Sequence, residues 1–272
     1  MTNFDQPFPD YELLDRVGGG AMGTVFKARH KRLGRIVALK ILKPSLARDK
    51  RYVERLRREA RIVASLSNPH IVTGYDLGEE GGYHFFVMEF VEGKSLRQLL
   101  VEWGMFAEEY VLRVARGVAE ALDHAYQRDV IHRDIKPGNM LVTREGTSKL
   151  VDFGLAVQQG GDDESEDLWA TPYYVPPEKL DGETDTYLGD IYSLGATLYH
   201  ALTGKPPFEA NTSSLEALKQ IKTADLNLKV EAPTSSKAIV KLIGRMMAYR
   251  PEARPQSYDL LLAEIIDIEK KF

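Results

Sequence analysis

The octapeptide HRDIKPGN at His132–Asn139 and the tetrapeptide VDFG at Val151–Gly154 decide how this sequence is interpreted. Each contains an aspartate, Asp134 in the first and Asp152 in the second. An isolated aspartate is usually a surface carboxylate. That explanation fails for two aspartates set in such a joint pattern with a lysine and an asparagine. The combined spacing indicates a functional site, and the flanking sequence shows what kind of site it is.

A glycine-rich stretch, GGGAMG at Gly18–Gly23, precedes these motifs and is followed by TVFKAR. Glycines at its first, third and sixth positions also suit a hairpin turn that binds no ligand. A dinucleotide-binding fingerprint would run into a helix, and an acidic residue would follow at the ribose position. The strand-like residues that follow instead predict a strand–turn–strand unit, which favours a nucleoside triphosphate over a dinucleotide.

The apolar run Val37–Leu39 ends in a single lysine, Lys40. The ordinary interpretation is an edge lysine whose stem packs on apolar surface while its ammonium reaches water. Glu59 favours a different one, because it lies among the apolar positions of a predicted helix, where an unpaired carboxylate is costly to bury. We therefore predict a Lys40–Glu59 ion pair that holds the ammonium in place for phosphate binding.

Composition excludes several classes of protein. The chain has 272 residues, of which 43% are hydrophobic and 28% charged, so it is long enough to bury a core and is neither fibrous nor extensively disordered. It has no cysteine, which excludes disulfide frameworks, thiolate metal sites and cysteine nucleophiles. This composition fits a reducing compartment.

Charge and hydropathy argue against nucleic-acid and membrane partners. The net charge is −4, although 14 Lys or Arg stand against three acids between Lys27 and Arg61. Without interleaved aromatic residues, that excess favours a solvated face around a phosphate site over a nucleic-acid patch. The longest uncharged stretch, Ile191–Gly204, has fourteen residues, below the roughly 18 needed to span a membrane, and predicts a buried core helix. The acidic N-terminus does not resemble a signal peptide.

Hydrophobic periodicity predicts strands first and helices afterwards. β-Branched and aromatic runs separated by glycines predict five strands, at residues 11–17, 24–29, 36–42, 71–76 and 83–90. Apolar residues at three- and four-residue spacing predict helices at 49–66, 107–126, 188–202 and 258–270. This order indicates an α+β chain in two lobes with a connector at 92–94, and residues 158–167 are expected to form a loop.

Taken together, the HRD, KPxN and DFG motifs resemble those of eukaryotic-type serine/threonine protein kinases in order and spacing. The resemblance covers residues 11–268, and GGGAMGTVFKARH looks most like the bacterial members. It implies a bilobal α+β protein-kinase fold. Residues 11–91 would form a small antiparallel β-sheet lobe with one helix, and residues 92–268 a larger, mainly helical lobe.

The resemblance implies a role for each residue that matches a motif. Asp134 would be the catalytic base for the substrate hydroxyl, and Lys136 would neutralise the phosphoryl group in transfer. Asn139 and Asp152 would hold Mg²⁺, with Mn²⁺ as an alternative metal. Lys40, paired with Glu59, would anchor the α- and β-phosphates of ATP. Backbone N–H groups of the glycine loop, at Gly18, Gly20 and Gly23, would cover those phosphates.

The same match implies an adenine site. Apolar side chains would sandwich the ring, and these are Val17, Val25, Ala38 and Leu141. Met88 falls at the position that limits the back of the pocket, and the Glu89 carbonyl and Val91 amide would read the edge of the base. Core packing explains each of these residues equally well when it is taken alone.

Other matches in the second lobe look structural. Pro176-Pro177-Glu178 stands where the family usually has Ala-Pro-Glu, Asp190 opens a DIYSLG segment, and Pro206-Pro207-Phe208 follows. Arg254 is placed to pair with Glu178. We expect that buried pair to hold the substrate-binding segment against the helical lobe.

Two positions depart from the family pattern. Ser165 lies within Asp162–Asp167, where five acids surround the one serine. This run could offer Arg133 the negative charge that a phosphate would otherwise add, although a solvated loop is the plainer interpretation. We hypothesise that activity does not strictly require phosphorylation. Gly74 stands where the family stacks an apolar side chain with Val63, His132 and Phe153, and either the stack is looser or Tyr75 fills the gap.

The resemblance also implies a substrate and a setting. Lys136 and Thr171 match the serine/threonine pattern rather than the tyrosine one, so we expect protein substrates with Ser or Thr acceptors, the kinase itself included through self-association. A pseudokinase scaffold and a small-molecule kinase are the alternatives. We expect no nucleic-acid partner, no membrane segment within these residues, and a cytoplasmic location, either as such or as the cytoplasmic domain of a longer membrane protein.

Overall fold

The computed structural model describes residues 8–158, 173–208, 215–222 and 231–272. The chain divides into two compact units, Met1–Glu92 and Gly93–Phe272, which we call the N-terminal unit and the C-terminal unit. The division falls within the predicted connector. In the part of the chain that the structure describes, no helix has the length and apolar character needed to cross a membrane.

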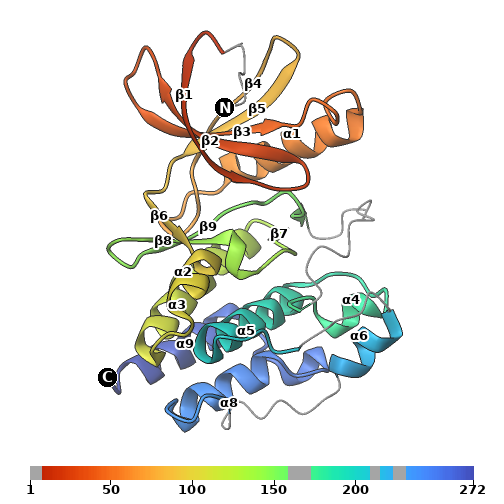
Figure 1. Cartoon of the computed structure of the whole chain (residues 1–272). Helices are drawn as coiled ribbons and strands as arrows, with labels where there is room; N and C mark the ends of the chain where they lie inside the picture. Colours follow the sequence, from red (N-terminus) through yellow and green to blue (C-terminus); the bar gives the residue numbers. More distant parts are fainter. Residues whose placement is uncertain (1–7, 159–172, 209–214, 223–230) are drawn as a thin grey trace. The chain divides into compact units, whose positions relative to one another are not determined.

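The N-terminal unit is an antiparallel sheet with one helix (Figure 1). Its strands, in the spatial order β1-β2-β3-β5-β4, are β1 (Tyr11–Gly19), β2 (Gly23–His30), β3 (Ile36–Leu42), β4 (Gly74–Glu80) and β5 (Tyr83–Glu89). One face of the sheet buries a cluster that includes Phe8, Tyr11, Phe26, Leu39, Phe85 and Val87. Every neighbouring pair of strands is antiparallel, as the alternation of strand-like runs and glycine turns predicted.

Helix α1 (Lys50–Ser65) begins where Asp49 caps it, since the carboxylate accepts a hydrogen bond from the Arg51 backbone N–H at 3.0 Å. Its apolar stripe, which includes Val53, Leu56 and Val63, is buried. The exposed side carries the arginines that make this region basic. Burial on one side and charge on the other explain why so basic a segment still forms a packed helix.

The C-terminal unit is mainly helical (Figure 1). Its helices are α2 (Leu96–Trp103), α3 (Glu108–Tyr126), η1 (Pro137–Asn139), α4 (Pro177–Leu180), α5 (Tyr187–Thr203), α6 (Leu215–Lys222), α8 (Lys237–Met246), η2 (Pro251–Ala253) and α9 (Tyr258–Glu269). Its short strands are β6 (Gly93–Ser95), β7 (Val130–Ile131), β8 (Met140–Thr143), β9 (Ser148–Leu150) and β10 (Val157–Gln158). Strands β6, β8 and β9 form one sheet, and β7 pairs with β10.

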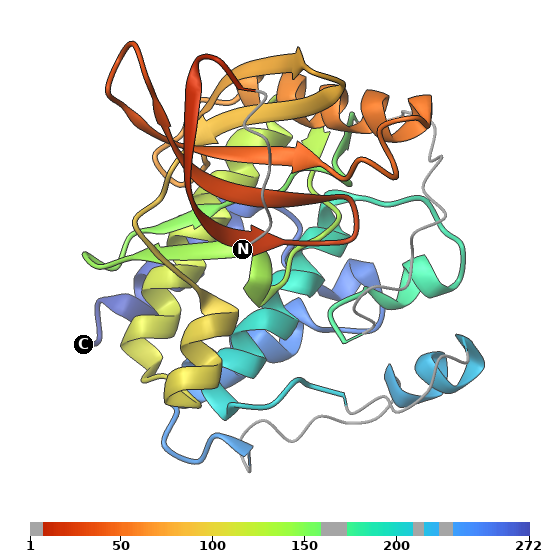
Figure 2. The ribbon, with the colours of Figure 1, turned by 45° about the horizontal axis from the view of Figure 1, so that its top comes forward.

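Helix α5 lies at the centre of this unit. It packs against α3 and α8, and α3 packs in turn against α9, as the ribbons show in both views (Figure 1 and Figure 2). Nearly all its residues are buried, including Ile191, Leu194 and Leu198. The expectation of a buried core helix at this place is confirmed. An all-round apolar sequence suits this position, because neighbours cover the helix on several sides.

The α+β prediction is correct, and one predicted strand is misplaced. The run expected at 71–76 does not pair as a strand at its start, since β4 begins at Gly74 and continues to Glu80. Ile71 and Val72 are buried in the core, so their β-branched character reflects burial and not sheet pairing. The true strand continues through a Gly-Glu-Glu run at the edge of the sheet, where one polar face is tolerated.

Candidate active site

The glycine-rich stretch forms the tight turn between β1 and β2. The Gly20 N–H donates to the Gly23 carbonyl at 2.9 Å, which confirms the strand–turn–strand prediction. A Cβ on Gly23 would lie 2.6 Å from the Ile41 carbonyl oxygen, so packing alone requires glycine there. A Cβ on Gly20 would meet no protein atom within 4 Å, and one on Gly18 would make only ordinary contact with Val25. Gly18 and Gly20 therefore leave room that a ligand can occupy.

Lys40 on β3 and Glu59 on α1 form the predicted ion pair. The Lys40 Nζ lies 2.7 Å from each carboxylate oxygen of Glu59, and the two side chains are 11% and 2% exposed. The pair offsets the cost of burying the Glu59 carboxylate on the apolar stripe of α1, because Lys40 on β3 supplies the matching positive charge. It also fixes the ammonium at a point still reached by solvent.

The residues expected around an adenine ring fall into two groups. Ala38 on β3 faces Met88 on β5 as a cross-strand pair, and Val25 on β2 faces Lys40. Val17 on β1 is 44% exposed, which is unusual for an apolar residue of a sheet and leaves its side chain available to a planar ligand. Val17, Val25, Ala38 and Met88 all lie in the N-terminal unit.

The remaining residues of the predicted adenine site lie at and beyond the end of β5. Glu89 exchanges hydrogen bonds with Thr73, whose carbonyl accepts the Glu89 N–H at 2.8 Å and whose N–H donates to the carboxylate at 3.2 Å. Val91 is buried just after the strand. Leu141 is on β8 of the C-terminal unit. The assignment of these residues to a base-binding site stays a prediction.

Asp134, Lys136 and Asn139 are brought together at the η1 turn. The Lys136 Nζ lies 2.8 and 2.7 Å from the two oxygens of Asp134. The Asn139 side-chain amide donates to the backbone carbonyl of Asp134 and to its Oδ2, each at 2.9 Å. The carboxylate is therefore oriented from two sides. Because the Asn139 amide nitrogen makes both contacts, its Oδ1 is not used in holding Asp134.

Hydrogen bonds join the HRD loop to the VDFG segment. The Val151 N–H donates to the Asn139 carbonyl at 3.0 Å, and the His132 Nε2 lies 3.3 Å from the Val151 carbonyl. Burial lowers the pKa of His132, so the ring is neutral. Its Nδ1 then accepts the Asp134 N–H at 3.2 Å, and its Nε2–H is the donor to Val151. Asn139 and Asp152 are thus held on adjoining segments.

Asp190, near the start of α5, binds the backbone of the HRD loop. Its two carboxylate oxygens accept the backbone N–H groups of His132 and Arg133, both at 2.8 Å. Burial raises the pKa of Asp190 to about 7, against the lowering effect of these two hydrogen bonds. From the sequence, Asp190 was expected to be structural, and this contact was not predicted. An acid at the head of an apolar helix was the available signal, because it needs buried donors.

A profile of the protein kinase domain family matches residues 11–265. This chain belongs to the protein kinase domain family. A probable serine/threonine-protein kinase of Clostridium perfringens is 36% identical to it over 96% of the chain, and the match covers 38% of that relative. Serine/threonine-protein kinase PrkC of Bacillus subtilis is 34% identical over 94% of the chain, which covers 40% of PrkC.

Serine/threonine-protein kinase PknD of Mycobacterium tuberculosis is 36% identical over 94% of the chain, with 39% of PknD covered. The chain therefore spans about two-fifths of the length of these relatives. The bilobal α+β fold that the motifs implied is the fold of this family.

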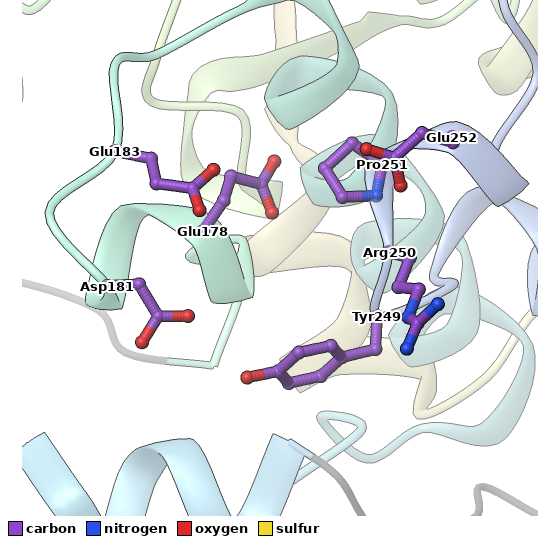
Figure 3. A pocket seen from close by; sticks show the side chains of 7 residues that line it. All are labelled: Glu178, Asp181, Glu183, Tyr249, Arg250, Pro251 and Glu252. Atoms are coloured by element: carbon purple, nitrogen blue, oxygen red, sulfur yellow. The ribbon is translucent and has the colours of Figure 1, made fainter.

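The second ion pair expected in this kinase domain, Glu178–Arg254, is also present. The Arg254 guanidinium donates to the two oxygens of Glu178 at 2.5 and 2.7 Å, and the Arg254 side chain has no exposed surface. The pair lies beside an open pocket of about 430 Å³ (Figure 3). One wall carries Glu178, Asp181 and Glu183, and the other is formed by residues 249–252.

The two departures from the kinase pattern have different outcomes. A Cβ on Gly74 would lie 3.3 Å from both Val63 and the ring of Phe86, so Phe86 fills the space beside the glycine. Tyr75, the residue expected to fill the gap if the stack was not looser, instead stacks on the Arg35 guanidinium, with the ring centroid 3.9 Å from its carbon. In the C-terminal unit, His132 and Phe153 contact each other with ring centroids 4.6 Å apart. The acidic run around Ser165, and Thr171, lie outside the described residues.

Proposed function

We propose that this kinase domain transfers the γ-phosphate of ATP to serine and threonine hydroxyls of protein substrates, including its own chain. The observation that carries the proposal is the Asp134 carboxylate, held between the Lys136 ammonium and the Asn139 amide. A carboxylate oriented in this way, beside a cation, suits the acceptance of a proton next to a developing negative charge. The named relatives are serine/threonine kinases, which supports the same class of acceptor.

In the proposed reaction the substrate hydroxyl oxygen attacks the γ-phosphorus, and its proton passes to Asp134. The bond between the γ-phosphorus and the bridging oxygen of ADP breaks as the new phosphorus–oxygen bond forms, so ADP leaves in line with the attacking hydroxyl. Lys136 balances charge on the phosphoryl oxygens during transfer. Little covalent work is left to the protein, so positioning and charge neutralisation do most of the catalysis.

Asn139 and Asp152 fit a magnesium ion by the chemistry of their donors. The hydrogen bonds to Asp134 use the amide nitrogen of Asn139 and leave its Oδ1 out. This oxygen and the Asp152 carboxylate would be the two hard ligands that hold the ion. A bound Mg²⁺ ion supplies charge neutralisation at the phosphate oxygens. We propose Mg²⁺ as the physiological metal and Mn²⁺ as a substitute. In the N-terminal unit, Lys40 would hold the α- and β-phosphates and the glycine turn would cover them.

We propose that residues 11–91 bind the nucleotide and that residues 92–268 carry out transfer and bind the protein substrate. The Glu178–Arg254 pair, next to the Pro-Pro segment, supports the second assignment because it braces the segment that precedes α5. We also place the kinase in the cytoplasm, either free or as the cytoplasmic domain of a longer membrane protein. The length of the relatives is the observation behind the second possibility.

The decisive experiment incubates the kinase with Mg-ATP and a generic protein substrate and identifies phosphorylated sites by mass spectrometry. Asp134→Asn removes the proton acceptor while preserving shape, and we expect phosphate incorporation to fall about 10²-fold or more. Equal incorporation by the wild type and the variant would contradict the catalytic assignment. Phosphate found only on tyrosine would contradict the serine/threonine class. The same assay with Mn²⁺ in place of Mg²⁺ measures the metal preference.

A further inference from the structure

Arg133 lies between His132 and Asp134 in the HRD loop, and its backbone conformation is strained. Its φ angle is +68°, in the left-handed region that residues other than glycine and asparagine rarely adopt. Such a conformation persists only where the surroundings hold it. Asp190 holds the backbone N–H of Arg133. The side chain has a separate anchor.

That anchor is Asp185, in the segment between α4 and α5. Asp185 Oδ2 lies 2.6 Å from both Nε and one terminal nitrogen of the Arg133 guanidinium. The two side chains are 9% and 2% exposed, respectively. A buried guanidinium requires a matched anion, and two nitrogens directed at one oxygen give a charge-assisted contact that fixes the orientation of the arginine.

The same carboxylate binds a second cation. The Lys179 Nζ on α4 donates to Asp185 Oδ2 at 3.0 Å, and Lys179 is also largely buried. Asp185 therefore connects the HRD loop to α4, the helix that begins at the second proline of the Pro-Pro segment. Two cations share this one oxygen, so the carboxylate offsets the repulsion between them.

We propose that Asp185 is a positioning residue for Asp134, acting through Arg133. The proposal rests on the proposed function, in which Asp134 accepts the substrate proton. Asp185 and Asp190 contact different parts of the loop. Asp190 accepts hydrogen bonds from the main chain at His132 and Arg133, and Asp185 binds the Arg133 side chain. Asp134, the next residue, takes its direction from this doubly anchored arginine. The negative charge that fixes the Arg133 side chain in the HRD loop comes from the Asp185 carboxylate and not from a phosphate group.

The test compares three variants of the kinase. Asp185→Asn keeps the size of the side chain and removes its charge. Asp185→Glu keeps the charge on a longer side chain. Glu183→Gln is the matched control, since it neutralises a carboxylate two residues from Asp185 in the same segment. The Glu183 side chain lines the pocket of Figure 3. The measurements are kcat, KM for ATP, the Tm of each variant, and hydrogen exchange at the amides of residues 131–136.

We expect Asp185→Asn to lower kcat about 10-fold to 100-fold at a temperature well below its Tm, because small displacements of a catalytic group have effects of this size. The KM for ATP should stay within about threefold, since Lys40 and the glycine turn are unaltered. Amides of residues 131–136 should exchange faster. Asp185→Glu should recover part of the lost kcat, and Glu183→Gln should behave as the wild type does.

Wild-type kcat and wild-type exchange in a folded Asp185→Asn variant would overturn the proposal. If that variant does not fold, Arg133→Met/Lys179→Met/Asp185→Leu replaces the whole buried cluster with apolar groups. This triple variant should fold and show the same loss of kcat, and an unchanged kcat would equally overturn the proposal. A wild type that transfers no phosphate would contradict the proposed function alone, because hydrogen exchange reads the anchoring of the loop without turnover.

Discussion

Two ion pairs, Lys40–Glu59 in the N-terminal unit and Glu178–Arg254 in the C-terminal unit, use the same chemistry in different surroundings. Both bring a buried glutamate to a cation distant in the sequence. Arg254 also donates to the backbone carbonyls of Leu188, Ala248 and Tyr249, at 2.9, 2.9 and 3.1 Å. Its five N–H donors are therefore all used within the protein. Lys40 keeps partial exposure, and its compact ammonium can meet an incoming anion.

The difference separates a pair that can bind a ligand from one that braces the fold. A guanidinium with no exposed surface and no spare donor has nothing to offer a substrate, so its contribution is to stability. An ammonium at the solvent boundary, oriented by a buried carboxylate, suits the phosphate-binding role that we propose for Lys40. Substitutions should therefore affect activity at one pair and unfolding at the other.

The largest effect should come from Lys40→Met. We expect kcat/KM for phosphate transfer to fall about 10²-fold or more, because one oriented electrostatic donor contributes on this scale. The measurement is steady-state kinetics, with circular dichroism to show that the variant is folded. Lys43→Met is the matched control, since Lys43 follows the same strand and its side chain is exposed. Equal losses in the two variants, or none in Lys40→Met, would remove Lys40 from the mechanism.

Next in size is Arg254→Met, which should lower the free energy of unfolding by about 3–5 kcal/mol, because it leaves Glu178 buried without its cation. Denaturant unfolding followed by fluorescence measures this value. The control is Arg250→Met, on the wall of the pocket beside the pair, where surface substitution should change the free energy of unfolding by less than about 0.5 kcal/mol. An Arg254→Met variant as stable as the wild type would show that the pair does not brace the unit.

Lys222 extends the comparison to a buried cation that, among the described residues, has no ion pair. Its Nζ lies over the rings of Phe208 and Tyr192, at 4.9 and 5.3 Å from their centroids, and 3.5 Å from the Tyr173 carbonyl. Burial lowers the pKa of Lys222 to about 7, although Glu178 nearby acts in the opposite direction. Folding therefore disfavours the charged form of Lys222. In the unfolded chain the ammonium keeps its proton up to the ordinary pKa of a lysine.

The smallest effect, and one that depends on pH, should come from Lys222→Met. Because the unfolded state binds the proton more tightly, wild-type stability should rise as the pH increases from about 7 toward 10. Lys222→Met should raise the Tm by roughly 2–6 °C at pH 6.5, and this gain should shrink as the pH rises. Thermal melts across that range make the measurement. Lys219→Met, at a half-exposed lysine paired with Asp181, is the control, and a gain independent of pH would contradict the prediction.

Much of the fold and the Lys40–Glu59 pair could be predicted from local patterns in the sequence. The Glu178–Arg254 pair joins residues 76 positions apart and was expected only from the resemblance to protein kinases. Glu59 on an apolar stripe required a cation, and Lys40 supplied it. Strand–turn–strand geometry followed from glycines between β-branched runs. The segment 71–76 was misplaced because burial and strand pairing select the same residues, as Ile71 and Val72 show.

The anchoring of the HRD loop could not be predicted in the same way. The Asp190 contacts join residues separated by 57 and 58 positions, and the Asp185 contact joins residues separated by 52. No local pattern encodes which donor a carboxylate meets across such a distance. Asp185 in particular lies in a polar loop, where an acid is the ordinary residue and carries no signal of burial.

The position of Asp190 at the head of α5 has a consequence for synthesis of the chain. The loop that carries Asp134 is held by a helix that ends at Thr203, well after the loop itself has been made. A growing chain folds from its N-terminus, so the unit with Lys40 and Glu59 can be complete before that helix exists. A nascent chain that has not yet formed this helix therefore lacks the contacts that hold the loop of Asp134, even when its N-terminal sheet is complete.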